Sequence, residues 1–401
     1  MNKKNNKLKL QHDAKILLLI AGLFAIAIGL SNTFVNIYIW RIKKEYVSIG
    51  IYNLLIHITL PLTFILGGYI SKKRDGTSVL RIGIIFHTVF FLIIFLLREQ
   101  AVDYLIFLGS FLGISAGFYW LGFHILSFDL TNDMNRDTFN SYNGIVGSLS
   151  GMFAPLAAGF IITSMKGLKG YYLIFGISFI IFVIIIIISI FLHTQKYGEK
   201  YRLIRVIKLS SHSWKSIMVG TFFFGIRNGV FIFFVNLLIF IVLKSELDIG
   251  KITLIGALIS TLSYELIERI MKPPRRKSFI TLGTVMMFIS VVILIYKISF
   301  LSIIIFTILN AFFFPFFTVP FNSATYNILD KTHQEKNRTE YIVFKELVLN
   351  LGRITGIAAF IITVSNTKDI LNLKSLILLI GSSQLVIPLL LKAINKNAEV
   401  L

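Results

Sequence analysis

Long hydrophobic runs dominate this sequence and limit what it can fold into. About twelve runs of roughly 20 to 28 residues recur between short polar breaks, and an α-helix of that length crosses the hydrocarbon core of a bilayer. The runs do not alternate apolar with polar residues, as the strands of a membrane barrel would. We therefore predict an all-α membrane protein with transmembrane helices at 14–40, 46–70, 79–97, 103–128, 139–164, 171–193, 215–242, 249–271, 278–297, 300–328, 341–365 and 372–391.

Composition and charge support a membrane protein and exclude other classes. Of 401 residues 56% are hydrophobic and only 15% are charged, and there is no cysteine for a disulfide framework or a thiolate metal site. The formal charge of +21 does not indicate nucleic-acid binding, because the basic residues lie in short breaks and form no basic domain. We expect no metal and no cofactor.

The distribution of the 40 lysines and arginines predicts the topology. Most of them fall in the alternate breaks that share one side of the membrane with both chain ends, which is the positive-inside pattern. Both termini are therefore expected in the cytoplasm, with the protein in the cell membrane. The first apolar run continues to Trp40 without a small-x-small cleavage site, so we expect it to be a retained helix rather than a signal peptide.

The chain repeats itself. The segment FVNIYIWRIKKEYVSIG at 34–50 returns at 234–250 as FVNLLIFIVLKSELDIG, an offset of 234 − 34 = 200 residues. We therefore predict two six-helix halves, 1–193 and 215–401, joined by a polar cytoplasmic linker at 194–214. Within the linker, IRVIKL is expected to lie on the inner leaflet as a short amphipathic piece.

The break between the second and third runs, GGYISKKRDGTSVLRIG at 67–83, carries a family resemblance. Together with the helix number, the repeat and the central linker, it resembles the major facilitator superfamily of secondary transporters. The family's loop pattern is close to G-x-x-x-D-R-x-G-R-R. This chain has Gly68, then Lys72 in place of the aspartate and Lys73 in place of the arginine.

In the family, the missing aspartate belongs to a charge clasp that closes the cytoplasmic side. The matching segment of the second half, ERIMKPPRRK, retains an acid and a base in Glu268 and Arg269. The resemblance therefore implies a clasp formed mainly by the second half. The alternative is an ordinary basic inside loop without a gating role.

Two glycine patterns point to helix packing and helix bending. Gly109, Gly113 and Gly117 recur every fourth residue and are expected to let a neighbouring helix approach closely. In the fifth predicted helix, Gly151, Pro155 and Gly159 resemble the family's glycine-proline motif. That motif is frequent in antiporters and exporters, and it makes the helix bendable so that the two halves can rock.

Polar and aromatic side chains at membrane depth are the candidates for substrate binding or coupling, because such groups are costly against lipid. The candidates are Asn32, Asn36, His57, Tyr119, Trp120, His124, Arg227, Asn322, Glu346, Asn350 and Arg353, with His87 as a further proton acceptor. The alternative role for these residues is interhelical hydrogen bonding.

Charge at membrane depth is concentrated in the second half. Glu346, Asn350 and Arg353 are spaced i, i+4 and i+7 and should share one helix face. Together with Arg227 they give two cations and one acid. Either an anionic substrate supplies the missing partner, or Glu346 forms a structural ion pair with one of the arginines.

The resemblance implies a secondary transporter that works by alternating access. We expect a monomer that exports a small amphipathic organic anion or zwitterion by proton antiport, with Tyr119 and Trp120 packed against the apolar part of the solute. The alternatives are a lipophilic-cation exporter attracted by Glu346, and a sensor or partner subunit on the same fold. No P-loop and no H-E-x-x-H helix are present, so we expect no enzymatic activity.

Overall fold

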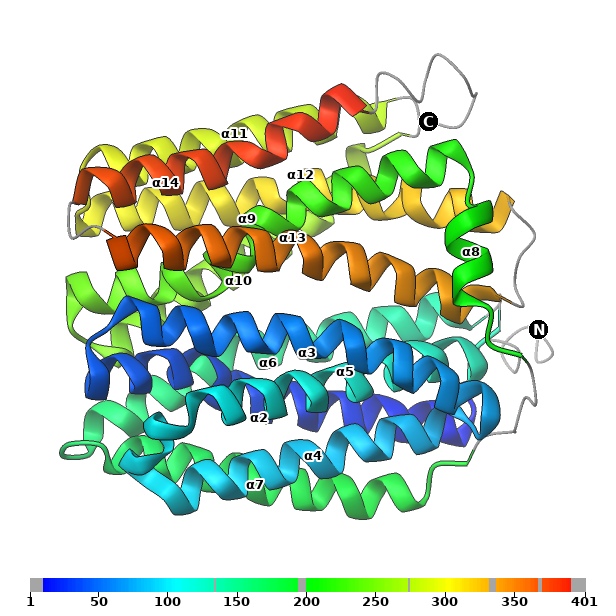
Figure 1. Ribbon diagram of the computed structural model, residues 1–401, viewed down its shortest axis with the longest axis horizontal. Coiled ribbons are helices and arrows are strands. Elements are labelled where there is room, and N and C mark those ends of the chain that lie inside the picture. The colour runs from blue at the N-terminus through cyan, green and yellow to red at the C-terminus, as the bar shows by residue number, and fades with distance from the viewer. Residues whose placement is uncertain are drawn as a thin grey trace.

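The computed structural model describes residues 10–132, 135–193, 200–272, 275–331, 337–366 and 370–390. Eleven stretches of this part of the chain are long and apolar enough to cross a membrane, and one of them, Gly76–Asp129, contains both α4 and α5, which makes twelve helices. The predicted all-α architecture is confirmed (Figure 1).

The first half contains α2 to α7 and the second contains α9 to α14, with the short helix α8 between them. The bounds are α2 His12–Lys43, α3 Tyr46–Lys73, α4 Gly76–Leu97, η1 Arg98–Tyr104, α5 Leu105–Asp129, α6 Arg136–Ser164, α7 Lys169–Ile190, α8 Leu203–Leu209, α9 His212–Leu243, α10 Glu246–Ile270, α11 Arg276–Tyr296, α12 Phe300–Lys331, α13 Arg338–Asn366, α14 Ile370–Ser382 and η4 Ser383–Val386.

The sequence repeat reappears in the helix geometry. α2 and α9 each have 32 residues, and each is followed by a lysine with left-handed backbone, Lys44 and Lys244, both at φ 54°. The Lys44 N–H donates to the Trp40 carbonyl, and the Lys244 N–H donates to the Phe240 carbonyl. Such a residue caps a helix by satisfying one of its last free carbonyls. The first helix of each half therefore ends in the same way, 200 residues apart.

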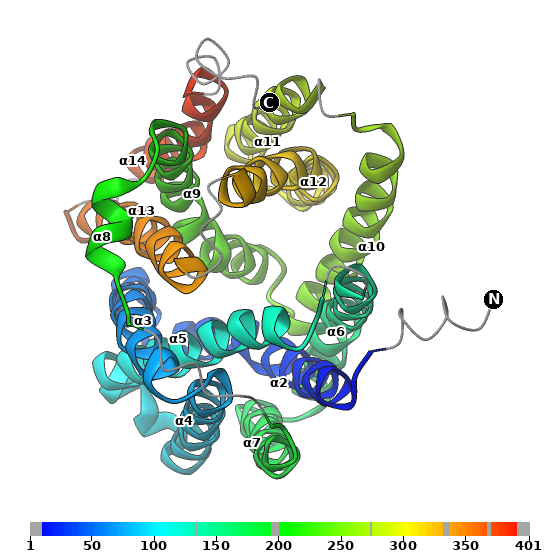
Figure 2. The same cartoon turned by 90° about the vertical axis from the view of Figure 1, so that its right-hand side faces the viewer.

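Two pairs of helices bring the halves together. α3 lies beside α13, and α6 lies beside α10 (Figure 2). Both described chain ends lie at the same end of the molecule as α8, which we call the linker end (Figure 1). The other end, which carries the α2–α3, α6–α7 and α9–α10 connections, is called the opposite end.

The predicted glycine packing is confirmed between α5 and α3. A Cβ on Gly109 would lie 2.5 Å from the Tyr52 carbonyl oxygen, and one on Gly113 would lie 2.1 Å from Thr59 Oγ1. Gly117 approaches the next turn of α3 in the same way. Any larger side chain at these positions would push the two helices apart.

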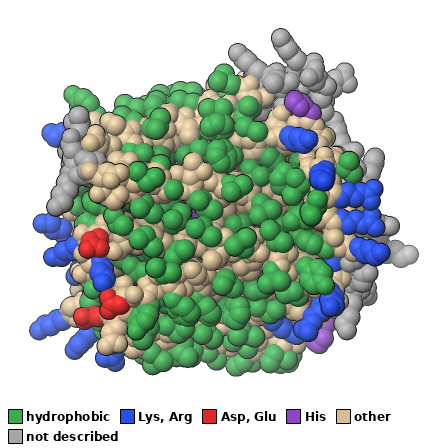
Figure 3. Space-filling view, in the orientation of Figure 1, with side chains coloured by type: hydrophobic (Ala, Val, Ile, Leu, Met, Phe, Trp, Pro, Cys, Tyr) green, Lys and Arg blue, Asp and Glu red, His purple; other side chains and the backbone are tan. Residues whose placement is uncertain are grey.

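The surface has the polarity that a bilayer requires. Hydrophobic side chains cover the middle of the face in Figure 3, whereas lysines and arginines gather at its two ends. Many large apolar side chains are exposed on the helices, including Phe153, Phe160 and Ile180. An apolar belt of this kind belongs in lipid rather than in water.

Candidate functional site

A central cavity of about 530 Å³ lies between the halves. Helices α2 to α5 of the first half and α9 and α13 of the second half supply its wall. Seven of the eleven predicted site residues line the cavity: Asn32, Asn36, His57, Trp120, His124, Glu346 and Arg353. His87, the further proton acceptor, lines it as well. Asn53 and Asn236 also line it and were not among the predicted site residues.

Amide side chains form the part of the wall that α2, α3 and α9 contribute. Asn53 Nδ2 donates to Asn36 Oδ1 at 2.7 Å, and both residues are buried. Asn32 lies one turn before Asn36 on α2 and is exposed to the cavity. Amides both donate and accept hydrogen bonds, so this wall can bind polar groups of either kind.

A polar cluster centred on Asn350 connects the two halves. His57 Nδ1 of α3 lies 3.0 Å from Asn350 Oδ1 of α13. The same Oδ1 accepts from Arg353 Nη1 at 3.3 Å, and Asn350 Nδ2 donates to Glu346 Oε2 at 3.1 Å. The three α13 side chains lie on one face, as their spacing predicts, and a buried amide separates the acid from the base.

Arg353 has hydrogen bonds but no counter-ion. Its Nε donates to Asn228 Oδ1 at 2.9 Å, in addition to the contact with Asn350. Among the described residues, no carboxylate lies within 4.0 Å of its guanidinium nitrogens. The structural Glu346–Arg353 ion pair considered as an alternative is therefore not formed. The cavity wall carries a cation whose charge is not neutralised by direct contact.

Arg227 does not line the cavity. It is 3% exposed within the second half, its Nη2 donates to Asn310 Oδ1 at 2.5 Å, and its guanidinium lies 4.6 Å from the centre of the Phe231 ring. Asn322 also lies away from the cavity, exposed and 3.4 Å from Lys345 Nζ. The expectation that these two residues face a substrate is corrected: both are turned toward neighbours in their own half.

Tyr119 and Trp120 are neighbours in sequence with different surroundings. Tyr119 is 1% exposed and stacks on Phe24, with 3.4 Å between ring centroids. Trp120 is 40% exposed on the cavity wall, with His124 beside it at 6.1 Å between ring centroids. Of these two residues only Trp120 lines the cavity, so the expected contact of Tyr119 with a substrate is corrected.

The acid and base predicted for the clasp, Glu268 and Arg269, form no ion pair across the halves among the described residues. Arg269 forms its ion pair with Glu265, one turn earlier on α10, and both side chains are exposed. Glu268 is exposed as well. Lys73 is exposed above the Tyr69 ring, and Lys72 is buried. An ion pair within one helix cannot hold two domains together.

The linker itself covers the α3–α13 contact at the linker end. The ring of Tyr201 lies against Gly68, where a Cβ would be 2.8 Å from it. The Arg202 N–H donates to Glu340 Oε1 of α13 at 3.0 Å, and Glu340 is fully buried. Burial, and secondly the nearby Glu340 carboxylate, raise the pKa of the Tyr201 hydroxyl. Gly68 thus provides space for a linker side chain, and α8 packs on the bundle.

The glycine-proline segment of α6 marks where the halves touch. A Cβ on Gly159 would lie 2.5 Å from the Glu246 carbonyl oxygen of α10, and one on Gly250 of α10 would lie 2.8 Å from backbone atoms of Pro155 and Leu156. Around Gly151, nearer the linker end, no heavy atom of the described chain lies within 4 Å of such a Cβ. α6 is one continuous helix through Pro155. Gly159 therefore allows close approach of the halves at the opposite end.

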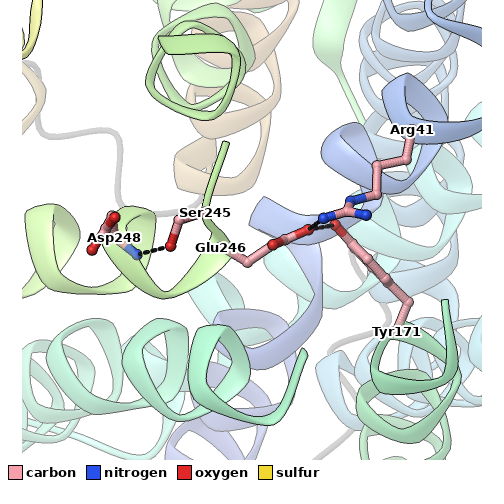
Figure 4. A network of polar contacts seen from close by, with 5 residues as sticks. All are labelled: Arg41, Tyr171, Ser245, Glu246 and Asp248. Atoms are coloured by element: carbon pink, nitrogen blue, oxygen red, sulfur yellow. Dashed lines mark hydrogen bonds and ion pairs between the residues drawn. The ribbon is translucent and has the colours of Figure 1, made fainter. Parts of the chain in front are cut away.

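One polar network at this contact was not predicted from the sequence. Arg41 of α2 and Tyr171 of α7 both bind the carboxylate of Glu246, the first residue of α10 (Figure 4). The available signal was the position of Glu246 inside the repeated segment, opposite Glu45 of the first half. The sequence does not reveal which distant helix supplies the partners.

Comparisons with known proteins agree with the fold and the central cavity. The family model described as Major Facilitator Superfamily matches residues 17–357. The uncharacterized protein YqgE of Bacillus subtilis (strain 168) is 36% identical over 356 residues, covering 88% of this chain and 83% of that protein. A second uncharacterized protein, from the sodM 3' region of Geobacillus stearothermophilus, is 42% identical over 167 residues, covering 42% of this chain and 78% of that protein.

Solved transporter structures share the architecture. A mutant form of the nucleoside transporter NupG has a TM-score of 0.72 at 13% identity and covers 95% of this chain and 99% of that chain. The human organic anion transporter MFSD10 has a TM-score of 0.68 at 13% identity, with 96% and 99% covered. At such identities only the fold is compared. From the family match and these neighbours, the chain belongs to the Major Facilitator Superfamily and is a membrane transporter rather than an enzyme.

Proposed function

We propose that this transporter moves an amphipathic organic anion or zwitterion by alternating access, with Arg353 binding the anionic group. The observation that carries the proposal is the Arg353 guanidinium on the cavity wall, which has amide partners but no carboxylate within ion-pair distance among the described residues. An arginine at membrane depth costs at least about 2.5 kcal/mol even on the lenient insertion scale. A carboxylate or phosphate on the solute would offset that cost through charge-assisted, bidentate hydrogen bonds.

The rest of the cavity suits a solute with an apolar part and further polar groups. The exposed Trp120 ring offers a flat apolar surface, and the amides of Asn32, Asn36 and Asn236 offer donors and acceptors. Apolar walls with a few converging polar groups are typical of small-molecule sites. Glu346, on the same wall as Arg353, could accept the ammonium group of a zwitterion.

A lipophilic cation is the competing substrate, and a specific observation favours it. Glu346 lines the cavity, and its carboxylate accepts a hydrogen bond from Asn350 but forms no ion pair with a described residue. A carboxylate and an exposed tryptophan that line the same cavity can both attract an organic cation. The two hypotheses predict opposite effects of replacing Arg353 by a neutral residue: an anion should bind more weakly, and a cation should bind more tightly.

Coupling to protons is proposed through Glu346, with His57, His87 and His124 as further candidates on the cavity wall. Protonating Glu346 would leave Arg353 as the charge on that wall, so a proton and an anion would bind together. This arrangement favours co-transport. The antiport and export suggested by the glycine-proline motif require the proton and the solute to compete, and the sign of the pH effect on binding decides between them.

We also propose that both termini and the 194–214 linker face the cytoplasm, and that the protein works as a monomer in the cell membrane. The excess of lysine and arginine in the alternate breaks supports this orientation. Single cysteines introduced into this cysteine-free chain should then react with an impermeant reagent in intact cells at the α6–α7 loop but not in the linker. Labelling of the linker from outside would refute the orientation.

The test of transport is flux into liposomes that contain the purified protein. The panel includes organic anions, zwitterions, nucleosides and lipophilic cations, each with and without a pH gradient. We expect saturable, protein-dependent flux of an amphipathic anion or zwitterion. Flux restricted to cations would refute the anion site, and absence of flux across the whole panel would favour a sensor or partner subunit on this fold.

A further inference from the structure

Glu246 is a buried acid that lies at the contact of the halves at the opposite end and does not line the central cavity. It is 3% exposed, and its Oε1 lies 2.7 Å from Arg41 Nη2 and accepts from the Tyr171 hydroxyl at 2.7 Å (Figure 4). Arg41 and Tyr171 belong to the first half, whereas Glu246 begins α10 of the second. These two contacts therefore connect the two halves directly.

The backbone around Glu246 explains why the carboxylate is sheltered. Its carbonyl oxygen contacts Gly159 of α6, and Gly250, one turn further along α10, contacts Leu156. The Arg41 guanidinium lies 5.3 Å from the centre of the Phe240 ring, and its side chain is 35% exposed. The pair is thus buried on the acid side and reachable by water on the arginine side.

Few charged groups face the Glu246 carboxylate, so its own charge determines whether the ion pair with Arg41 forms. α2 contributes Arg41, α7 contributes Tyr171, and the contacts from α6 and α9 bring no titratable group. On α10 itself, Asp248 pairs with Lys251 at the exposed surface. Glu45, in the α2–α3 connection, is exposed and accepts from Ser48. Arg41 is therefore the counter-ion of Glu246 among the described residues.

A buried carboxylate is stable only while its charge is compensated, and an ion pair of this kind weakens when the acid becomes neutral. If the halves separate at the opposite end, as alternating access requires, Arg41 and Tyr171 must move away from Glu246. An ionised Glu246 exposed in that step loses both partners, whereas a protonated one loses only a neutral hydrogen bond. Protonation therefore lowers the cost of opening this end.

We propose that Glu246 is a proton-binding site, separate from the central cavity, whose protonation releases Arg41 and lets the two halves part at the opposite end. The proton comes from the water at that end and binds a carboxylate oxygen, and the freed guanidinium is hydrated where it stands. Releasing the proton restores the ion pair and closes this end again. The inference rests on the proposed alternating access but not on the substrate class.

The experiment measures the separation of the halves at this end directly. Spin labels are attached to cysteines replacing the exposed Lys166, in the α6–α7 loop, and the exposed Lys297, in the α11–α12 loop, so the native chain adds no background thiol. A matched pair at the linker end replaces Arg74 and Lys272, which are also exposed. Distances are recorded by pulsed electron paramagnetic resonance at pH about 8 and about 4, which lie on either side of the ordinary glutamate pKa of about 4.3.

In the otherwise unchanged chain we expect one short distance at the opposite end at high pH and a growing long-distance population at low pH. Glu246→Gln should show the long distance at both pH values, with the pH response lost. Arg41→Gln, which removes the partner and keeps the acid, should open this end already at high pH. Glu246→Asp keeps a titratable group and should keep the response.

Two results would overturn the inference. One is an unchanged chain whose opposite-end distance does not respond to pH, and the other is a Glu246→Gln variant that keeps the full response. Well-defined linker-end distances in each variant, changing in the opposite sense to the distance at the other end, show that the protein is folded. A pH response without anion flux would refute the substrate class alone, and anion flux without a pH response at this end would refute the Glu246 site alone.

Discussion

Replacing Arg353 by Gln is expected to abolish binding of the transported anion while the protein still folds and inserts. The guanidinium lies on the cavity wall, held by Asn228 and Asn350 and lacking a carboxylate partner among the described residues. Removing one member of a desolvated, hydrogen-bonded charge pair costs about 2 to 5 kcal/mol, which is an affinity loss of roughly 30-fold to several thousand-fold. Binding of the labelled solute to the purified variant measures the effect.

Arg227→Gln is the matched control, because it makes the same substitution on another helix of the same half. Arg227 is enclosed by Asn310 and Phe231 and does not line the cavity. The variant should change thermal stability and leave anion affinity within a few-fold of the unchanged protein. Arg353→Lys keeps the charge but not the bidentate geometry and should fall between the two. Normal binding by Arg353→Gln would assign that arginine to packing.

The architecture was predictable because it depends on properties that are local in sequence. A bilayer forces every spanning segment to be a long apolar helix, so the twelve runs predict twelve helices with no knowledge of their contacts. The repeat predicts two similar halves, and the left-handed backbone of Lys44 and Lys244 shows the same likeness at two helix ends. The spacing of Gly113 and its neighbours correctly predicted one helix contact.

The orientation of single side chains was less predictable. Tyr119 and Trp120 are about 100° apart around the same helix, so one faces the core and the other the cavity. The depth of Arg227 and Arg353 is similar, and depth alone does not say which of them meets Asn310 and which meets the cavity. Rotation of a helix is set by packing against its neighbours, and a single sequence does not contain that information.

The network around Glu246 was missed for a related reason. Its ion-pair partner Arg41 is 246 − 41 = 205 residues away, on the other half, and no local pattern connects the two. From the sequence, an arginine at a helix end is an ordinary boundary residue. The expected clasp at Glu268 and Arg269 came from a family loop pattern whose letters match poorly here, and the structure places the ion pair of Arg269 within one helix.

Replacing Glu346 by Gln is expected to remove the pH dependence of anion binding. Glu346 lines the cavity, and Asn350 connects its carboxylate to Arg353. An ionised Glu346 opposes an incoming anion, and a protonated one does not. In the unchanged protein, anion affinity should therefore rise as pH falls. The variant, which resembles the protonated acid, should bind with high affinity at every pH.

Transport assays distinguish a loss of proton coupling in Glu346→Gln from a loss of substrate binding. Glu346→Gln should lose accumulation driven by a pH gradient and retain exchange of labelled for unlabelled solute, because exchange requires substrate binding but no proton movement. His124→Ala removes the neighbouring cavity histidine and should keep both activities if Glu346 alone carries the proton. If anion affinity in the unchanged protein decreases as pH falls, the proton and the solute compete for binding, which indicates antiport. A pH dependence that survives in Glu346→Gln would move the proton site to the histidines.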